Sequence, residues 1–92
     1  MKNTDNNWSV YIILCSDKTL YTGITTDIER RLKEHSSNNG AKYFRGRSPE
    51  KVMYLEGGHN KSTASKRELY IKSLTRREKE QLIQSIGNEM EA

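Results

Sequence analysis

The chain has 92 residues, of which 33% are hydrophobic and 30% are charged. A chain of this length has little surface to spare for a second core, so the sequence predicts one domain, and its apolar clusters exclude a disordered polymer. One cysteine excludes a disulfide framework or a zinc cluster, while a net charge of +4 suits a polyanionic partner as well as ordinary solubility.

The N-terminal region gives no sign of export or membrane insertion. Residues 1–7 are polar and lack the apolar stretch of a signal peptide, and no run in the chain approaches the roughly 20 apolar residues that span a bilayer. We therefore expect a cytoplasmic protein without a membrane partner, and a monomer by default.

The first half of the chain predicts a disordered tail over 1–7, a hairpin and a helix. Residues 8–15 have the β-branched and aromatic content of a strand, 16–18 a turn, and 19–24 a second strand. Gly23 ends this hairpin, where a missing side chain indicates that the backbone closely approaches another group. Thr26 and Glu29 match a capping box, which predicts a helix over 26–37.

The second half predicts one more strand and two more helices. After a loop over 41–49, the third strand covers 51–56 and is ended by Gly57 and Gly58, and a helix covers 62–73. A second capping box, Thr75 with Glu78, opens a last helix that stops at Gly87, with 87–92 as a frayed C-terminus. The order β-β-α-β-α-α predicts an α+β fold, a small three-stranded sheet flanked by helices, in a single domain over 8–86.

Helix periodicity groups several polar residues on shared stripes of the predicted helices. Asp27, Arg31 and His35 share one stripe of the first helix, so Arg31 and His35 point the same way. Pairing of Arg31 with Asp27 on a solvated face is the alternative. Glu68 lies on the inward stripe of the next helix, where either a basic side chain or a divalent metal satisfies its charge.

Two tyrosines, Tyr11 and Tyr21, lie in the predicted hairpin strands. Tyrosine is common in strands, because its ring packs while its hydroxyl reaches water or a partner. The register of the hairpin, which the spacing does not fix, decides whether the two hydroxyls meet.

Taken together, these residues resemble the GIY-YIG nuclease superfamily. Ser9–Tyr11 stands where the GIY triplet would be and Tyr21–Gly23 where YIG would be, and Arg31, His35 and the distant Glu68 complete the pattern. The resemblance covers about residues 8–83 and extends to the small single-domain bacterial members. It implies a GIY-YIG-like fold with an antiparallel sheet.

The resemblance also implies an endonuclease that hydrolyses phosphodiester bonds with one divalent metal ion, Mg or Mn. Glu68 would hold the metal, and Arg31 would hold phosphate oxygens through its planar fork of donors. Tyr11 is the candidate base for the attacking water, with Tyr21 sharing that role or orienting the water. His35 would assist as a proton carrier or a phosphate donor.

A basic loop is the predicted rim for a nucleic-acid substrate. Lys42, Arg45 and Arg47 would meet phosphates while a neighbouring aromatic residue stacks on an unpaired base, and a solvated loop is the alternative. Lys72 lies one turn from Glu68 and can reach the site, with solvation of the helix end as the alternative.

The sequence therefore predicts a DNA endonuclease, with DNA favoured over RNA, that acts on branched, nicked or single-stranded structures and is linked to DNA repair or recombination. The alternative is a module that keeps the GIY-YIG fold and binds nucleic acid or docks onto a protein without catalysis. One family role stays unassigned, because Asn88 lies farther along than the asparagine that many members carry after the glutamate.

Overall fold

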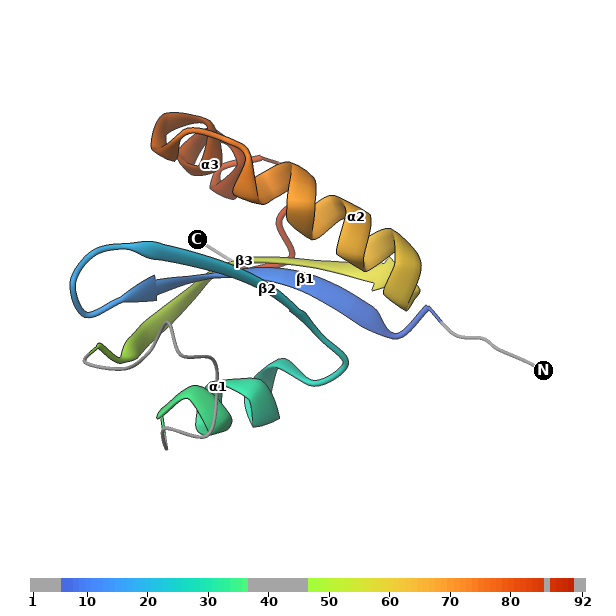
Figure 1. Ribbon diagram of the computed structural model, residues 1–92, viewed down its shortest axis with the longest axis horizontal. Helices are drawn as coiled ribbons and strands as arrows, with labels where there is room; N and C mark the ends of the chain where they lie inside the picture. Colours follow the sequence, from blue (N-terminus) through green and yellow to red (C-terminus); the bar gives the residue numbers. More distant parts are fainter. Residues whose placement is uncertain (1–5, 37–46, 86, 91–92) are drawn as a thin grey trace.

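A three-stranded antiparallel sheet forms the middle of the molecule (Figure 1). The computed structural model describes residues 6–36, 47–85 and 87–90. Its elements, in chain order, are β1 (Trp8–Cys15), β2 (Leu20–Thr25), α1 (Ile28–Ser36), β3 (Pro49–His59), α2 (Lys61–Lys72) and α3 (Arg76–Ile83). The predicted α+β fold and the order β-β-α-β-α-α are confirmed. Within the described ranges, every helix is too short or too polar for a transmembrane span.

β1 is the central strand, with β2 on one side and β3 on the other, and both pair with it in the antiparallel sense. Helices cover both faces of the sheet: α1 lies on one face, and α2 with α3 lies on the other (Figure 1). Residues on both sides of β1 are therefore buried, which explains why this strand is an almost continuous apolar run.

Alternate residues of β1 build two cores. The first joins β1 to α2 through Val10, Ile12, Ala64 and Ile71. The second joins β1 to α1, and it contains Tyr11, Ile13, Ile28 and Leu32. Tyr11 therefore lies on the side of the sheet that α1 covers, as the period of two along a strand requires.

The start of α1 differs from the prediction, because Thr26 does not cap it. Asp27 does so instead: its Oδ1 accepts a hydrogen bond from the backbone N–H of Arg30 at 3.1 Å. The hydroxyl oxygen of Thr25 in turn accepts from the backbone N–H of Asp27 at 3.0 Å. The helix consequently begins at Ile28, and the capping box predicted from Thr26 and Glu29 is wrong.

β3 is longer than predicted and continues through the two glycines to His59. It does so because His59 still pairs with Trp8 at the start of β1, after a shift in register. Gly58 has a φ of 79°, in the left-handed region that favours glycine, and this residue absorbs the irregularity. The last helix, α3, ends at Ile83, before the stop that the sequence predicts at Gly87.

The end of the described chain is attached to the outer edge of β3, where the sequence predicts a frayed C-terminus. The side chain of Asn88 accepts from the backbone N–H of Leu55 at 3.1 Å and donates to the carbonyl of Met53 at 2.9 Å. The backbone N–H of Glu89 donates to the carbonyl of Leu55 at 2.8 Å. These bonds satisfy backbone groups of an edge strand, so residues 88 and 89 belong to the folded domain.

Candidate functional site

Gly23 allows the ring of Tyr11 to lie directly against the backbone of β2. The two residues are opposite each other in the antiparallel register. A Cβ placed on Gly23 would lie 2.5 Å from the hydroxyl oxygen of Tyr11 and 2.6 Å from its Cζ, which is closer than such atoms approach one another. The close approach that the sequence predicts at this glycine is therefore made by the phenol of Tyr11.

Two tyrosines and a histidine form an aromatic cluster at this position. The ring centroids of Tyr11 and Tyr21 are 6.3 Å apart, and Tyr21 meets His35 edge-on with centroids 5.6 Å apart. The hydroxyl oxygen of Tyr11 lies 3.1 Å from Nε2 of His35 in a hydrogen bond. Tyr11 and His35 are each only 1% exposed, so this bond is fixed by packing from β1 and α1.

Arg31 adds a guanidinium to the same cluster, one helical turn before His35. Its Nη1 forms an ion pair with Oε1 of Glu34 at 2.8 Å, and Asp27, the partner considered in the sequence, caps the helix instead. Arg31 partly lowers the pKa of both tyrosines, through a hydrogen bond and its positive charge at Tyr11 and through its charge alone at Tyr21. The Nε of Arg31 is buried and has no hydrogen-bond partner in the described part of the chain.

Glu68 approaches the cluster from α2. Its Oε2 pairs with Nζ of Lys72 at 3.1 Å, so a basic side chain satisfies this carboxylate, which is one of the two possibilities that the sequence leaves open. The negative charge of Glu68 contributes to raising the pKa of Tyr11 and of Tyr21, and the ammonium of Lys72 lowers the pKa of Tyr21. Glu68 therefore lies within electrostatic reach of both phenols, and Lys72 within reach of Tyr21.

Burial sets the protonation states of the cluster. Burial raises the pKa of Tyr11 to about 12, against the smaller lowering effect of Arg31, and burial also raises the pKa of Tyr21. For His35 burial is again the main cause, followed by the Arg31 charge, and both lower the pKa of the imidazole. At neutral pH the cluster thus offers two protonated phenols beside a neutral imidazole, with Arg31 and Lys72 as its cations.

This region offers a metal ion a single carboxylate among the described residues. Among the described residues, no three His, Cys, Asp or Glu side chains converge in a way that could hold a metal ion. Glu68 is a single carboxylate whose side chain is 20% exposed. Mg²⁺ keeps several water ligands and is commonly held by one or two carboxylates together with substrate phosphates, so one accessible carboxylate is compatible with it.

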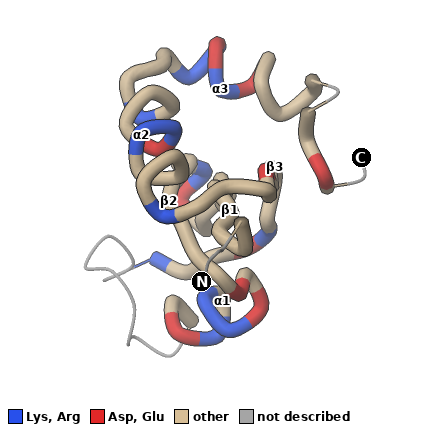
Figure 2. Tube along the Cα trace, turned by 90° about the vertical axis from the view of Figure 1, so that its right-hand side faces the viewer, with Lys and Arg blue, Asp and Glu red and all other residues tan. Residues whose placement is uncertain are grey.

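The predicted basic contacts are only partly visible. Lys42 and Arg45 lie outside the described residues. Arg47 is described, and its Nε pairs with Oδ2 of Asp17 at 3.0 Å, at the turn between β1 and β2. Lysine and arginine positions also occur along α1 and α2, the two helices on either side of the sheet (Figure 2). A role of these side chains in binding nucleic acid stays a prediction.

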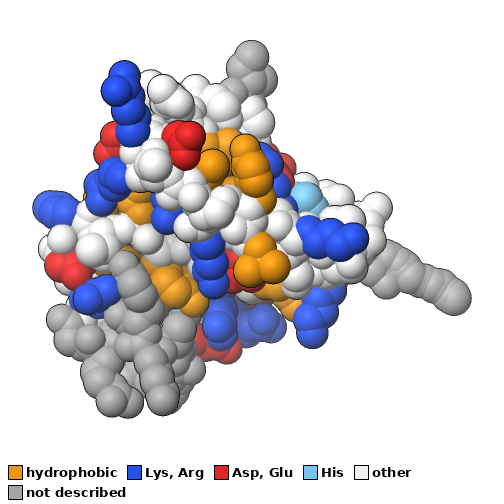
Figure 3. Space-filling view, turned by 45° about the horizontal axis from the view of Figure 1, so that its top comes forward, with side chains coloured by type: hydrophobic (Ala, Val, Ile, Leu, Met, Phe, Trp, Pro, Cys, Tyr) orange, Lys and Arg blue, Asp and Glu red, His pale blue; other side chains and the backbone are white. Residues whose placement is uncertain are grey.

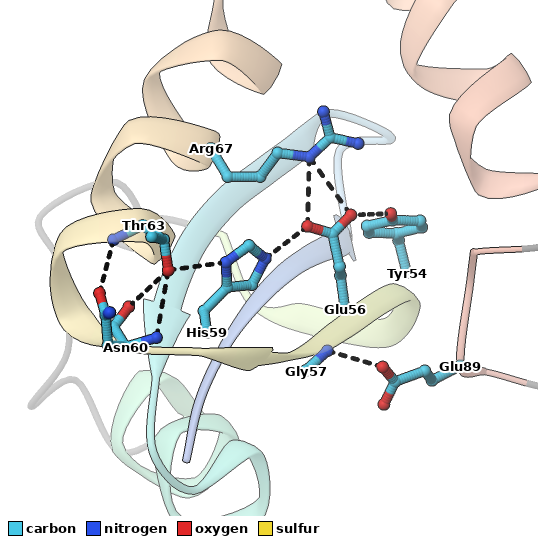
Figure 4. A network of polar contacts seen from close by, with 8 residues as sticks. All are labelled: Tyr54, Glu56, Gly57, His59, Asn60, Thr63, Arg67 and Glu89. Atoms are coloured by element: carbon cyan, nitrogen blue, oxygen red, sulfur yellow. Dashed lines mark hydrogen bonds and ion pairs between the residues drawn. The ribbon is translucent and has the colours of Figure 1, made fainter. Parts of the chain in front are cut away.

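A second polar cluster joins the end of β3 to α2, and the sequence analysis does not identify it (Figure 4). The carboxylate of Glu56 accepts hydrogen bonds from the hydroxyl of Tyr54 and from Nε of Arg67 at 3.2 Å, and it lies 2.6 Å from Nε2 of His59. Tyr54 and Glu56 are alternate residues of one strand and so share a face, which was the available signal. Because Arg67 precedes Glu68, this cluster fixes the part of α2 that presents Glu68.

The outer surface of α2 and α3 is chemically mixed. Large apolar side chains that are exposed in the described residues are Leu69 and Tyr70, at 68% and 56%. The guanidinium of Arg67 lies 5.2 Å from the centre of the Tyr70 ring, and lysines and arginines are scattered among apolar groups on this face (Figure 3). Such a surface differs from the continuous apolar patch that is typical of a protein-docking face.

Comparison with known proteins points to one family. A model of the GIY-YIG catalytic domain matches residues 7–81. A UPF0213 protein of Clostridium perfringens is 54% identical over 76 residues, covering 83% of this chain and 82% of that protein. A UPF0213 protein of Haloquadratum walsbyi is 53% identical over 73 residues, covering 79% of this chain and 82% of that protein. Since the second organism is an archaeon, similar proteins are not confined to bacteria.

Solved structures give the same result. The solution NMR structure of a UPF0213 protein from Bacillus halodurans matches with a TM-score of 0.56 and 44% identity, covering 89% of this chain and 87% of that one. The solution NMR structure of a protein from E. faecalis matches with a TM-score of 0.61 and 38% identity, covering 100% of this chain and 97% of that one.

Proposed function

Because this chain belongs to the GIY-YIG domain family, we propose that it is an endonuclease that hydrolyses phosphodiester bonds in DNA with one divalent metal ion, Mg or Mn. The observation that carries this proposal is the convergence of Tyr11, Tyr21, Arg31 and His35, with Glu68 facing them from α2. The proposed substrates are branched, nicked or single-stranded DNA of the kind processed in repair or recombination.

Arg31 is the proposed phosphate ligand. Its Nη1 is anchored by Glu34, which orients the guanidinium, while its buried Nε has no partner in the described part of the chain. A donor without a partner in a buried place is costly, and a phosphate oxygen would satisfy it. We therefore assign Arg31 to a phosphate oxygen of the substrate.

Tyr11 and His35 form the proposed path for the proton of the attacking water. As the water oxygen bonds to phosphorus, its proton passes to the phenol oxygen of Tyr11, and the phenol passes its own proton to Nε2 of His35. The imidazole can accept it because burial and Arg31 keep His35 neutral. The bond from phosphorus to the leaving oxygen breaks, and that oxygen takes a proton from solvent.

Glu68 is the proposed metal ligand. A divalent ion held there would neutralise charge that develops on the phosphate and the leaving oxygen. The side chain of Lys72 is 48% exposed and its stem is flexible, so it can leave Glu68 and contact a phosphate instead.

The proposal is tested with labelled duplex, flap, junction and single-stranded DNA and RNA in the presence of Mg or Mn. Glu68→Gln is expected to lower the cleavage rate by at least about 100-fold, and Tyr11→Phe by about 10²–10⁴-fold, which is typical of lost acid–base catalysis. Glu80→Gln is the matched control, because Glu80 also pairs with a basic residue one turn away on a helix, at 3.0 Å from Arg76.

The outcomes distinguish an active endonuclease from a non-catalytic module with the same fold. Metal-dependent products that disappear with Glu68→Gln and persist with Glu80→Gln support the endonuclease. Retention of DNA without products indicates a binding module that keeps the GIY-YIG fold, and equal cleavage by both variants refutes the assigned metal ligand. A rate that falls as pH drops through the lowered pKa of His35 further supports the imidazole as proton acceptor.

A further inference from the structure

A groove opens beside the tyrosine cluster, where the start of β1, the end of β2 and the first turns of α1 and α2 meet. Its volume is about 340 Å³, and its lining includes Trp8, Ile24, Thr26, Arg30, Arg31 and Lys61. This volume lies at the lower end of the range for small-ligand sites, about 300–1,000 Å³. Arg31 belongs both to this lining and to the tyrosine cluster, so this residue links the two sites. We call this feature the Trp8 groove.

Within the described ranges, the charged groups that line the Trp8 groove are cations. Arg30 and Arg31 project from α1 and Lys61 from α2, and no acidic side chain of those ranges lines the groove. Glu34 pairs with Arg30 at 3.7 Å and with Arg31 at 2.8 Å, which orients both guanidinium groups without neutralising Lys61. The side chain of Arg30 remains 57% exposed. The groove is thus suited to an anion.

Trp8 adds a flat aromatic surface to these cations. Nζ of Lys61 lies 5.7 Å from the centre of its ring, in a loose cation–π contact. Stacking of a nucleobase on an aromatic ring is stronger than such an exposed contact, so a base can replace the ammonium over the ring. Lys61 would then turn to the adjoining phosphate. An aromatic plane with cations around it matches a nucleotide better than it matches a simple anion, which would leave the ring unused.

We propose that the Trp8 groove binds one unpaired nucleotide of the substrate strand, next to the phosphate that Arg31 holds. The base stacks on Trp8, and Arg30 and Lys61 contact its phosphate. This inference rests on the proposed function, and it deepens it, because a base inside a duplex is stacked on its neighbours and cannot reach the ring. The substrate class is therefore DNA with a single-stranded segment beside the cleaved bond.

The binding test uses the fluorescence of Trp8, which is the one tryptophan in the sequence. The full chain is titrated at low salt, in the presence of a chelator, with a short oligodeoxythymidylate and with a blunt hairpin duplex of equal phosphate number. Quenching by the single strand at concentrations where the duplex leaves the fluorescence unchanged is expected. Single-strand binding that leaves Trp8 fluorescence unchanged, or equal quenching by both probes, would overturn the inference.

Substitutions in the Trp8 groove, each with a control variant, distinguish a loss of affinity from a loss of folding. Trp8→Ala is expected to weaken single-strand affinity about 5- to 100-fold, the loss typical of one stacked base, while Trp8→Phe retains most of it. Because Trp8 also packs against the core, Lys61→Gln is the second variant, with Lys66→Gln on the same helix as the control of equal charge. A greater loss of affinity from Lys61→Gln than from Lys66→Gln supports the groove, and equal losses refute it.

Failure of this inference and failure of the proposed function give different results. Cleavage of flap or single-stranded DNA with no change in Trp8 fluorescence on binding removes the Trp8 groove and leaves the endonuclease. Quenching by the single strand without any cleavage in Mg or Mn keeps the groove and removes the endonuclease.

Discussion

Replacing Gly23 by alanine tests whether this glycine exists to admit the ring of Tyr11. The added methyl group would lie 2.5 Å from the hydroxyl of Tyr11, and because Tyr11 is 1% exposed, its ring can shift only by disturbing its packing and its hydrogen bond to His35. We expect a net loss of about 2 kcal/mol in the free energy of unfolding. Overpacking costs about 1–3 kcal/mol, and loss of the hydrogen bond between Tyr11 and His35 costs about 1 kcal/mol. Replacing a glycine within a strand offsets about 0.5–1 kcal/mol of that loss.

Urea denaturation followed by far-UV circular dichroism measures this loss, with a double-mutant cycle to assign its cause. In a Tyr11→Leu background the contact is gone, so Gly23→Ala should be neutral or slightly stabilising. Gly57→Ala is the control, because the nearest neighbours of its Cβ would be the flexible carboxylate of Glu89 at 3.3 Å and the hydroxyl of Ser9 at 3.5 Å. The same loss from Gly23→Ala in both backgrounds would show that the contact with Tyr11 is not the cause.

Three further predictions concern the frame around the site. Burial alone raises the pKa of Glu56, but hydrogen bonds from Tyr54 and His59 outweigh it and lower the pKa below 4.5. The free energy of unfolding of the wild-type protein should therefore decrease as pH falls below about 4.5 through that lowered pKa. Glu56→Gln should weaken this pH dependence, and an unchanged pH dependence in the variant would contradict the prediction. Asn88→Ala should lower the free energy of unfolding in urea by about 1–3 kcal/mol, because partly buried backbone partners on β3 are left unpaired. A loss near zero would mean that the C-terminal segment contributes nothing. Cys15 is buried and burial raises its thiol pKa, so a thiol reagent should react with it only on unfolding, and rapid labelling of the native protein would refute this.

The sequence predicts the fold well where local signals agree. The apolar run of β1 and the capping box of Thr75 with Glu78 locate their elements closely, because burial on both faces and reciprocal hydrogen bonds leave a direct trace in residue type. The prediction fails where partners distant in sequence decide the structure. Gly58 suggests a strand end, but pairing with Trp8 carries β3 onward. The C-terminal segment likewise depends on Asn88 meeting an edge strand, which no local pattern shows.

The candidate site is predictable only as a set of residue types. Helix periodicity places Arg31 and His35 on one side, and the family resemblance adds Tyr11, Tyr21 and Glu68. The register that puts Tyr11 opposite Gly23 decides their geometry, and no spacing rule supplies it. The cluster around Glu56 is harder still to foresee, because it requires a strand carboxylate to meet an arginine from a helix that follows it.

The α1 helix holds His35 rigidly, whereas the α2 helix holds Glu68 in an ion pair that can exchange. His35 on α1 is fully enclosed and bonded to Tyr11, so the proton path is rigid before any ligand binds. Glu68 on α2 has a half-exposed partner, Lys72, in an exchangeable ion pair of the kind that contributes little to stability. A single carboxylate that must first give up Lys72 should bind Mg²⁺ weakly in the absence of DNA. Phosphate oxygens complete such a site and also attract Lys72 away from Glu68, so metal and DNA should each strengthen the binding of the other.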